Sequence, residues 1–243
     1  MTQIIHKDVG TLGDLVGCHP ELIHLCDEKQ IDFCCGGDRS ITEICRARGW
    51  DADDFLAEVR ARIKSGEDGP VPTFETGQVA PLIDYILDRF HAGHRRDFEA
   101  LVQMAGKVWE VHGAKWPRMG VLSQLIDHLI KDICPHMLKE EQILFPMMLT
   151  QDQGRQGPVM CPSGGPAGPI AVMRKEHENV GELLASLAVV TDQFTPPTWA
   201  CPTFRSMFAL LKQLSEEIRL HVHLENNVLF PMAAKGKSNV PGG

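Results

Sequence analysis

HMLKEEQILFPM, at residues 136–147, is followed 85 residues later by a second copy of the same pattern, HVHLENNVLFPM at residues 221–232. Each copy holds a histidine and a glutamate four residues apart: His136 with Glu140, and His221 with Glu225. Residues at this spacing share one face of an α-helix, so each helix presents an imidazole and a carboxylate together. The proline that follows is expected to stop each helix. Two such helices facing each other predict a metal site, with ligands for two ions.

The apolar spacing predicts four long helical segments, separated by breaks rich in proline and glycine. They cover roughly residues 80–110, 119–150, 169–192 and 202–232. Alternate steps of three and four residues select an apolar seam in each segment, and a histidine interrupts every seam: His91, His136, His177 and His221. The same steps also place Leu87, Ile143, Met147 and Val228 on the seams. Because β-strand alternation is absent, the sequence predicts an all-α antiparallel four-helix bundle with these histidines facing its core.

The spacing of the histidines has a second regularity. His91 and His177 are 86 residues apart, and His136 and His221 are 85 residues apart. The spacing therefore predicts two helix pairs that repeat the same pattern. In each pair, the first helix carries one histidine and the second carries a histidine with a glutamate. Such a repeat predicts a pseudo-two-fold bundle around a symmetric centre for two metal ions.

The chemistry of these side chains favours iron. A core that holds two carboxylates and several imidazoles needs a compensating cation, because burying an unpaired carboxylate costs several kcal/mol. Nitrogen and oxygen ligands together suit Fe, Mn or Zn, and the absence of thiolates on the seams disfavours structural zinc. Six protein ligands on two ions would leave room for a bridging oxygen species and a small exogenous ligand.

Other interpretations exist for single residues. A lone histidine on an apolar seam is more often a core residue, and it is the repeat with glutamate that favours ligands. We expect His94 in the core or behind the ligands, Glu141 and Glu176 in solvent or behind the ligands, and His223 on the surface. Pro135 is expected to kink the second long helix or to divide it into two pieces.

The sequence predicts a small helical domain at residues 1–64, a linker at residues 65–79 and the bundle at residues 80–235. Within it, Cys34 and Cys35 precede two glycines that permit a sharp turn and leave the thiols accessible. The pair could be redox-active or could bind soft metal ions. Alternatively, one thiol is buried and the other has no role.

Composition restricts the function classes. The chain has 243 residues, of which 43% are apolar, and a formal net charge of −8. The acidic balance argues against nucleic acid or an anionic membrane as the main partner. No apolar run reaches membrane-spanning length, and the chain start lacks a basic flank before an apolar stretch, so we expect a cytoplasmic protein. The eight cysteines form no regular framework and are expected to be reduced.

Together these motifs resemble the RIC family (repair of iron centres), the YtfE, ScdA, DnrN and NorA type of protein. The resemblance rests on DFCCGG at 32–37, His91, the segment 136–146, EHE at 176–178 and LENNVLFP at 224–231. It covers nearly the whole chain, and the CCGG turn together with two helices ending in LFP is highly specific. The resemblance implies a hemerythrin-like four-helix bundle with a non-haem di-iron centre, preceded by a small ScdA-type N-terminal domain.

The resemblance also implies a ligand set: His91, His136, Glu140, His177, His221 and Glu225. Glu140 and Glu225 would bridge two non-haem iron ions, alongside an oxo or hydroxo bridge. Compared with oxygen-carrying hemerythrins, Gly181 stands where those have a second histidine, and Glu225 replaces an aspartate one residue further on. The missing histidine predicts a more open site that suits iron release or reaction better than oxygen storage.

Three functions are compatible with the sequence. The family's association with iron–sulfur clusters damaged by nitric oxide or oxidants implies iron donation to damaged iron–sulfur proteins, with Cys34 and Cys35 as candidate redox or iron-transfer thiols. A second function is the reduction of nitric oxide to nitrous oxide, with electrons from an external donor because the chain has no flavin or nicotinamide motif. A third is the binding, scavenging or sensing of nitric oxide or oxygen. The resemblance is also compatible with a homodimer.

Overall fold

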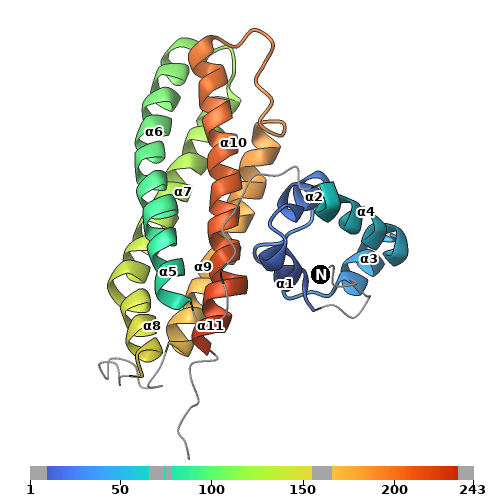
Figure 1. Ribbon diagram of the computed structural model, residues 1–243. Helices are drawn as coiled ribbons and strands as arrows, with labels where there is room; N and C mark the ends of the chain where they lie inside the picture. Colours follow the sequence, from blue (N-terminus) through green and yellow to red (C-terminus); the bar gives the residue numbers. More distant parts are fainter. Residues whose placement is uncertain (1–9, 66–73, 75–77, 155–165, 235–243) are drawn as a thin grey trace, which may run out of the picture. The chain divides into compact units, whose positions relative to one another are not determined.

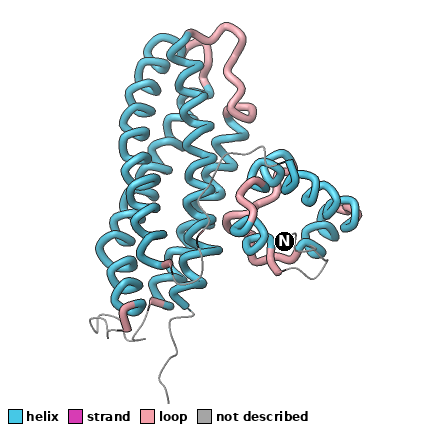
Figure 2. The backbone as a smooth tube through the Cα atoms, in the orientation of Figure 1, coloured by secondary structure: helices cyan, strands magenta, loops and turns pink. Residues whose placement is uncertain are grey.

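A computed structural model describes residues 10–65, 74, 78–154 and 166–234, and the chain divides into two compact units. One unit is Met1–Gln78 with Val222–Lys235, and the other is Val79–His221 with Gly236–Gly243. The described residues form helices and loops without a strand, apart from an isolated bridge between Thr11 and Ser40 (Figure 2). The predicted all-α class is therefore confirmed. Most of the expected linker at residues 65–79 lies outside the described residues.

Short helices make up residues 10–65 of the first unit. They are α1 (Leu12–Cys18), α2 (Leu22–Glu28), α3 (Ile41–Arg48) and α4 (Ala52–Ser65). Capping boxes start two of them: Thr11 exchanges hydrogen bonds with Asp14, and Ser40 with Glu43. These bonds satisfy backbone N–H groups that a first helical turn leaves without partners. The turn between α2 and α3 carries Phe33, which is buried with the apolar faces of the helices.

Four long helical segments form the bundle (Figure 1). The first consists of α5 (Val79–Tyr85), the π-helical turn η1 (Ile86–His91) and α6 (Ala92–His112). The second consists of α7 (Arg118–Lys139), η2 (Glu140–Leu144) and α8 (Phe145–Asp152), and the third is α9 (Ala167–Val190). The fourth consists of α10 (Pro202–His223), η3 (Leu224–Leu229) and α11 (Phe230–Ala234), and its residues from Val222 onward are grouped with the first unit.

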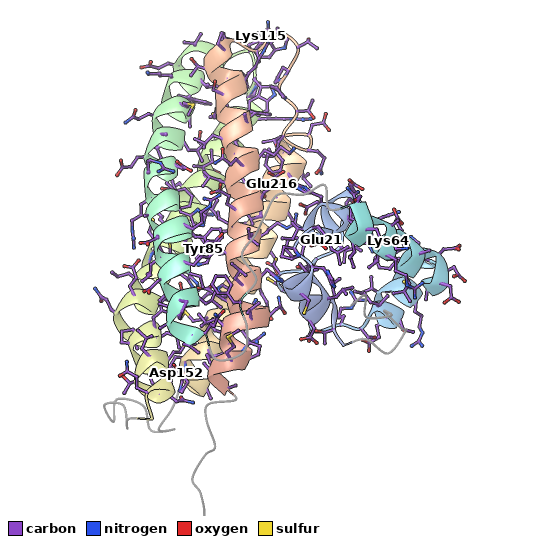
Figure 3. All side chains as sticks on the ribbon, viewed as in Figure 1. Glu21, Lys64, Tyr85, Lys115, Asp152 and Glu216 are labelled. Carbon is purple, nitrogen blue, oxygen red and sulfur yellow. The ribbon has the colours of Figure 1, made fainter. Side chains whose placement is uncertain are left out.

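The segments of the bundle pack through their apolar seams. Figure 3 shows side chains filling the space between the long helices, from Lys115 at one end to Asp152 at the other. The central seam positions of the second segment are buried, as predicted: Leu122, Ile126, Leu129 and Ile133. The connection between α6 and α7 is a short turn, which makes these two helices antiparallel neighbours. The predicted antiparallel bundle is confirmed.

The seam prediction is wrong within the π-helical turns, where burial moves by one residue. Ile143 is 43% exposed, whereas the next residue, Leu144, is 1% exposed. In the same way Leu229 is buried in place of Val228, and Ile86 in place of Leu87. A π-helical turn accommodates one extra residue, so the α-helical register of the seam is lost at each of these turns.

The expectation that prolines stop the helices is also wrong. Pro146 and Pro231 are the second residues of α8 and α11, each directly after a π-helical turn. The helix continues through both turns, because Phe145 and Phe230, directly before the prolines, donate their backbone N–H groups to the carbonyls of Glu140 and Glu225. Pro135 lies inside α7, which continues to Lys139, so the second segment is interrupted at η2 and not at this proline. Within the described residues, no helix is both long and apolar enough to cross a membrane.

Candidate metal centre

Three of the six candidate ligands belong to π-helical turns. His91 is the last residue of η1, Glu140 is the first residue of η2, and Glu225 lies in η3. Such turns are frequent at functional sites, and each one changes the direction of the side chains around it. The sequence spacing alone placed these residues on an α-helical seam, and the π-helical turns were not predicted.

One side of the site is formed by His91 and His221. Their Nε2 atoms are 3.2 Å apart. The Nε2 atom of His91 also lies 3.5 Å from Oε2 of Glu140. The ring of His221 stacks on Phe90, with ring centroids 5.3 Å apart and an interplanar angle of 4°. The two imidazoles therefore converge on one point beside a carboxylate.

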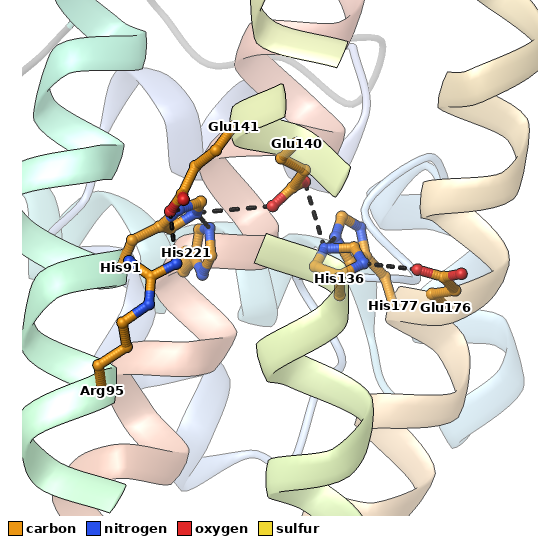
Figure 4. Close-up of polar contacts among 8 residues, drawn as sticks. All are labelled: His91, Arg95, His136, Glu140, Glu141, Glu176, His177 and His221. Atoms are coloured by element: carbon orange, nitrogen blue, oxygen red, sulfur yellow. Dashed lines mark hydrogen bonds and ion pairs between the residues drawn. The ribbon is translucent and has the colours of Figure 1, made fainter. Parts of the chain in front are cut away.

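The other side repeats this arrangement with His136 and His177. Their Nε2 atoms are 2.9 Å apart. The Nε2 atom of His136 lies 3.2 Å from Oε1 of Glu140. Figure 4 shows Glu140 between the two histidine pairs, with its two oxygens directed to opposite sides.

The six residues form two overlapping groups of ligand atoms. In each group the atoms lie within 4.8 Å of one another. The first group is His91, Glu140, His221 and Glu225, and the second is His136, Glu140, His177 and Glu225. All six residues are at most 1% exposed. Each group thus has its own pair of histidines, and both groups share the two glutamates.

The environment of Glu140 fits a cation. Both carboxylate oxygens are buried, and among the described residues neither accepts a hydrogen bond; the contacts with His136 and His91 are ion pairs only when those imidazoles are protonated. A buried carboxylate without such partners carries a desolvation cost of several kcal/mol, which a cation bound to it offsets. Imidazole nitrogens with carboxylate oxygens are a ligand set for first-row transition metals. The buried histidines and glutamates therefore fit iron binding.

A charged pair stands behind one histidine on each side of the site. Nδ1 of His91 lies 2.7 Å from Oε1 of Glu141, which also accepts a hydrogen bond from Arg95. Nδ1 of His136 lies 2.8 Å from Oε2 of Glu176, and the other oxygen of that carboxylate, Oε1, accepts a hydrogen bond from Lys139. A carboxylate at Nδ1 fixes the tautomer that leaves Nε2 available as a ligand.

These contacts change the acidity of both carboxyl groups. Partial burial would raise the pKa of Glu141, but the hydrogen bonds from Arg95 and His91 outweigh it and the pKa is lowered. The pKa of Glu176 is lowered in the same way, by Lys139 and His136 against the effect of burial. Glu141 and Glu176 were expected either in solvent or behind the ligands, and the structure places them behind the candidate ligands His91 and His136. Arg95 and Lys139 were missed, although each lies one helical turn after its histidine.

Two further histidines are buried. His94 is 0% exposed, and its ring centroid lies 5.5 Å from that of His221, in agreement with the expected core position. His223 was expected on the surface, but it is 1% exposed, so that expectation is wrong. The register of α10 turns it toward Phe33, whose ring centroid lies 5.5 Å away. Burial lowers the pKa of His223 to about 4.

The two predicted thiols lie together in the first unit. The Sγ atoms of Cys34 and Cys35 are 3.8 Å apart. Cys34 is 5% exposed, and Cys35 is partly exposed. Asn226 and Asn227 of η3 donate hydrogen bonds to backbone carbonyls of this turn. Both asparagines were missed, although they directly follow Glu225 in the repeated motif.

The fold and the site define a hemerythrin-type cation-binding protein. Residues 82–233 match the family described as Hemerythrin HHE cation binding domain, and residues 9–62 match ScdA_N, a domain of unknown function (DUF542). The chain is 36% identical to the iron-sulfur cluster repair protein YtfE of Musicola paradisiaca, over 96% of this chain and 100% of that protein. Proteins of the same name from an Enterobacter species and from Yersinia pseudotuberculosis are 35% and 34% identical, each over 93% of this chain and 97% of the relative. The chain belongs to the RIC family of iron–sulfur cluster repair proteins.

Proposed function

We propose that this protein repairs iron–sulfur clusters damaged by nitrosative or oxidative stress, and that it does so by donating iron held in its bundle. The observation that carries the proposal is the pair of ligand groups that share Glu140 and Glu225. Two ions bridged by two carboxylates can be held and released together. The names of the relatives support repair as the purpose of that iron.

In this proposal each histidine pair holds one of two iron ions. His91 and His221 serve one ion, His136 and His177 serve the other, and the two shared glutamates bridge them. Iron bound there supplies a redox-active Lewis acid. Protonation of the bridging carboxylates weakens their hold on the cargo, because only the deprotonated form is a good ligand.

The thiols of Cys34 and Cys35 are proposed to take part in iron transfer or redox chemistry. We also propose the division expected from the sequence: a small domain at residues 1–64, a linker at 65–79 and the bundle at 80–235. The recipients are damaged iron–sulfur proteins, which is the substrate class named for the relatives.

An anaerobic transfer assay tests this function. The reduced, iron-loaded protein is mixed with a cluster-depleted dehydratase and sulfide, and the returning dehydratase activity is followed together with the iron that stays on this chain. We expect iron loss to match the returning activity, and we expect the Glu140→Leu variant to restore none. Full repair by a variant without iron would overturn the donor mechanism.

The same assay distinguishes the alternative use of the bundle. If iron stays bound and activity does not return, the site handles nitric oxide instead. Nitrous oxide formed over many turnovers with an added reductant would then identify a reductase. Tight reversible binding of nitric oxide without turnover would identify a scavenger or sensor.

A further inference from the structure

In the turn that carries the two cysteines, three hydrogen-bond donors converge on the carboxylate of Asp32. Oδ1 of Asp32 accepts hydrogen bonds from the backbone N–H groups of Cys34 at 3.1 Å and Cys35 at 2.9 Å. The thiol of Cys34 donates to the same oxygen at 3.2 Å. As a result, one carboxylate oxygen and two sulfur atoms lie within 4.8 Å of one another.

We propose that Asp32, Cys34 and Cys35 form a second metal site, for a single thiophilic divalent cation such as Zn²⁺. This site differs from the bundle site in its chemistry, because two of its three ligands are sulfur. It does not rest on the iron-repair function, since it follows from the geometry of the turn alone.

The distances between the donor atoms fit a tetrahedral ion. Metal–sulfur bonds of about 2.3 Å at tetrahedral angles place two sulfur atoms about 3.8 Å apart. The observed separation of the Cys34 and Cys35 sulfur atoms is 3.8 Å. A metal–oxygen bond of about 2.0 Å would put the carboxylate oxygen about 3.5 Å from each sulfur. The contact between Asp32 and Cys34, at 3.2 Å, needs only a small change to reach that value.

The turn is held in this shape from behind. Asn226 donates a hydrogen bond to the carbonyl of Cys34 at 3.1 Å, and Asn227 donates to the carbonyls of Phe33 and Cys34 at 3.2 and 3.3 Å. A Cβ atom added at Gly37 would lie 2.6 Å from Oδ1 of Asn227. Only glycine therefore allows this close approach, and the ligands are ordered before an ion arrives.

The site also has an open side. Asp32 is exposed and Cys35 is partly exposed, so an ion can enter from solvent. Three protein ligands leave a fourth tetrahedral position for water or for a group from a partner. Atoms and charge balance on binding: the ion forms two metal–sulfur bonds, the two thiol protons pass to solvent, and no electron is transferred.

Cobalt(II) is a suitable probe, because thiolate ligands give it an intense near-ultraviolet charge-transfer band that imidazole and carboxylate ligands lack. Reduced full-length protein, with its bundle first loaded with iron, is titrated anaerobically with Co²⁺. We expect one equivalent to produce the band. Cys34→Ser and Cys35→Ser should each abolish it, and Asp32→Ala should weaken binding about tenfold or more, the equivalent of one lost ligand contact. Cys18→Ser, which removes an exposed thiol elsewhere in the same unit, is the matched control.

A second measurement needs no variant, so it tests the proposal even if a cysteine variant folds poorly. In the unmodified protein, Zn²⁺ should slow alkylation of Cys35 and leave alkylation of Cys18 unchanged, as measured by mass spectrometry. The proposal is overturned if Co²⁺ gives no charge-transfer band, if the band survives in both cysteine variants, or if Zn²⁺ does not protect Cys35.

Discussion

His91 and Glu141 are joined through Nδ1 and Oε1 at 2.7 Å, and Arg95 holds the same carboxylate oxygen from the other side. His136 and Glu176 are joined in a similar way, through Nδ1 and Oε2 at 2.8 Å, and Lys139 binds the other oxygen of that carboxylate. A carboxylate in this position orients the imidazole and increases the basicity of its second nitrogen. Two hydrogen-bonded sets of cation, carboxylate and histidine therefore orient the imidazoles of His91 and His136, one on each side of the site.

Replacing these carboxylates should weaken iron binding without removing a ligand. We expect Glu141→Gln and Glu176→Gln each to lower the iron affinity about 10- to 100-fold, the usual effect of losing such a partner. Competition with a chelator under anaerobic conditions measures the change. Glu178→Gln on the same helix as Glu176 is the control, because Glu178 is exposed and pairs with Lys175 at the surface. Equal affinities in all three variants would contradict the positioning role.

Glu140 should have opposite effects on stability with and without iron. In the metal-free protein, Glu140→Leu removes a buried carboxylate and should leave the free energy of unfolding unchanged or raise it by about 1 kcal/mol or more. In the presence of Fe²⁺ the unmodified protein should gain stability through binding, and the variant should not. Thermal unfolding with a chelator and with Fe²⁺, under anaerobic conditions, measures both effects.

The control for that comparison is Glu216→Leu, which changes an exposed glutamate on α10. It should respond to Fe²⁺ as the unmodified protein does. A large loss of stability in metal-free Glu140→Leu would show that this carboxylate is stabilised by groups of the protein and does not depend on a cation.

Acid should destabilise the fold through His223. Its pKa is about 4 in the folded protein, against 6.5 as the ordinary value, because burial disfavours the charged ring. The unfolded chain therefore binds more protons between these two pH values, so stability is complete above pH 6.5 and falls as the pH drops toward 4. The loss can reach about 3 kcal/mol. Denaturant unfolding at several pH values should show this loss, and His223→Phe should show a correspondingly smaller dependence on pH in that window.

Asn227 should contribute strongly to the stability of the first unit. Its amide donates to two carbonyls of the cysteine turn, and Asn227→Ala removes these donors from a part-buried site. We expect the free energy of unfolding to fall by about 1–3 kcal/mol, measured by denaturant titration. Asn179→Ala, at an exposed position of α9, should change it by less than about 0.5 kcal/mol. A similar small change for Asn227→Ala would show that the turn does not depend on these bonds.

The repeated motif and the apolar spacing around it predict much of this architecture. Hydrophobic spacing in each segment is sufficient to predict the long helices, since burial of an apolar stripe is what stabilises a helix in a bundle. The same spacing identifies the four seam histidines, because a polar residue on an apolar stripe stands out. Six candidate ligands could therefore be named from the sequence, and the structure brings their ligand atoms together in two groups.

Sequence spacing could not predict where the helices depart from α-helical geometry. The π-helical turns η1, η2 and η3 interrupt the α-helical spacing on which the seams depend, so the register of Ile143 and Val228 was predicted wrongly. The carboxylate partners of the candidate ligands lie far away in the chain: Glu141 is 50 residues from His91, and Glu176 is 40 residues from His136. His223 was misplaced for the same reason, because its contact with Phe33 spans 190 residues.

By itself the sequence determined the helices and the identity of the candidate ligands, since both depend on local spacing. The tertiary structure alone decided which carboxylate supports which histidine, because only packing brings residues distant in the chain within hydrogen-bonding distance.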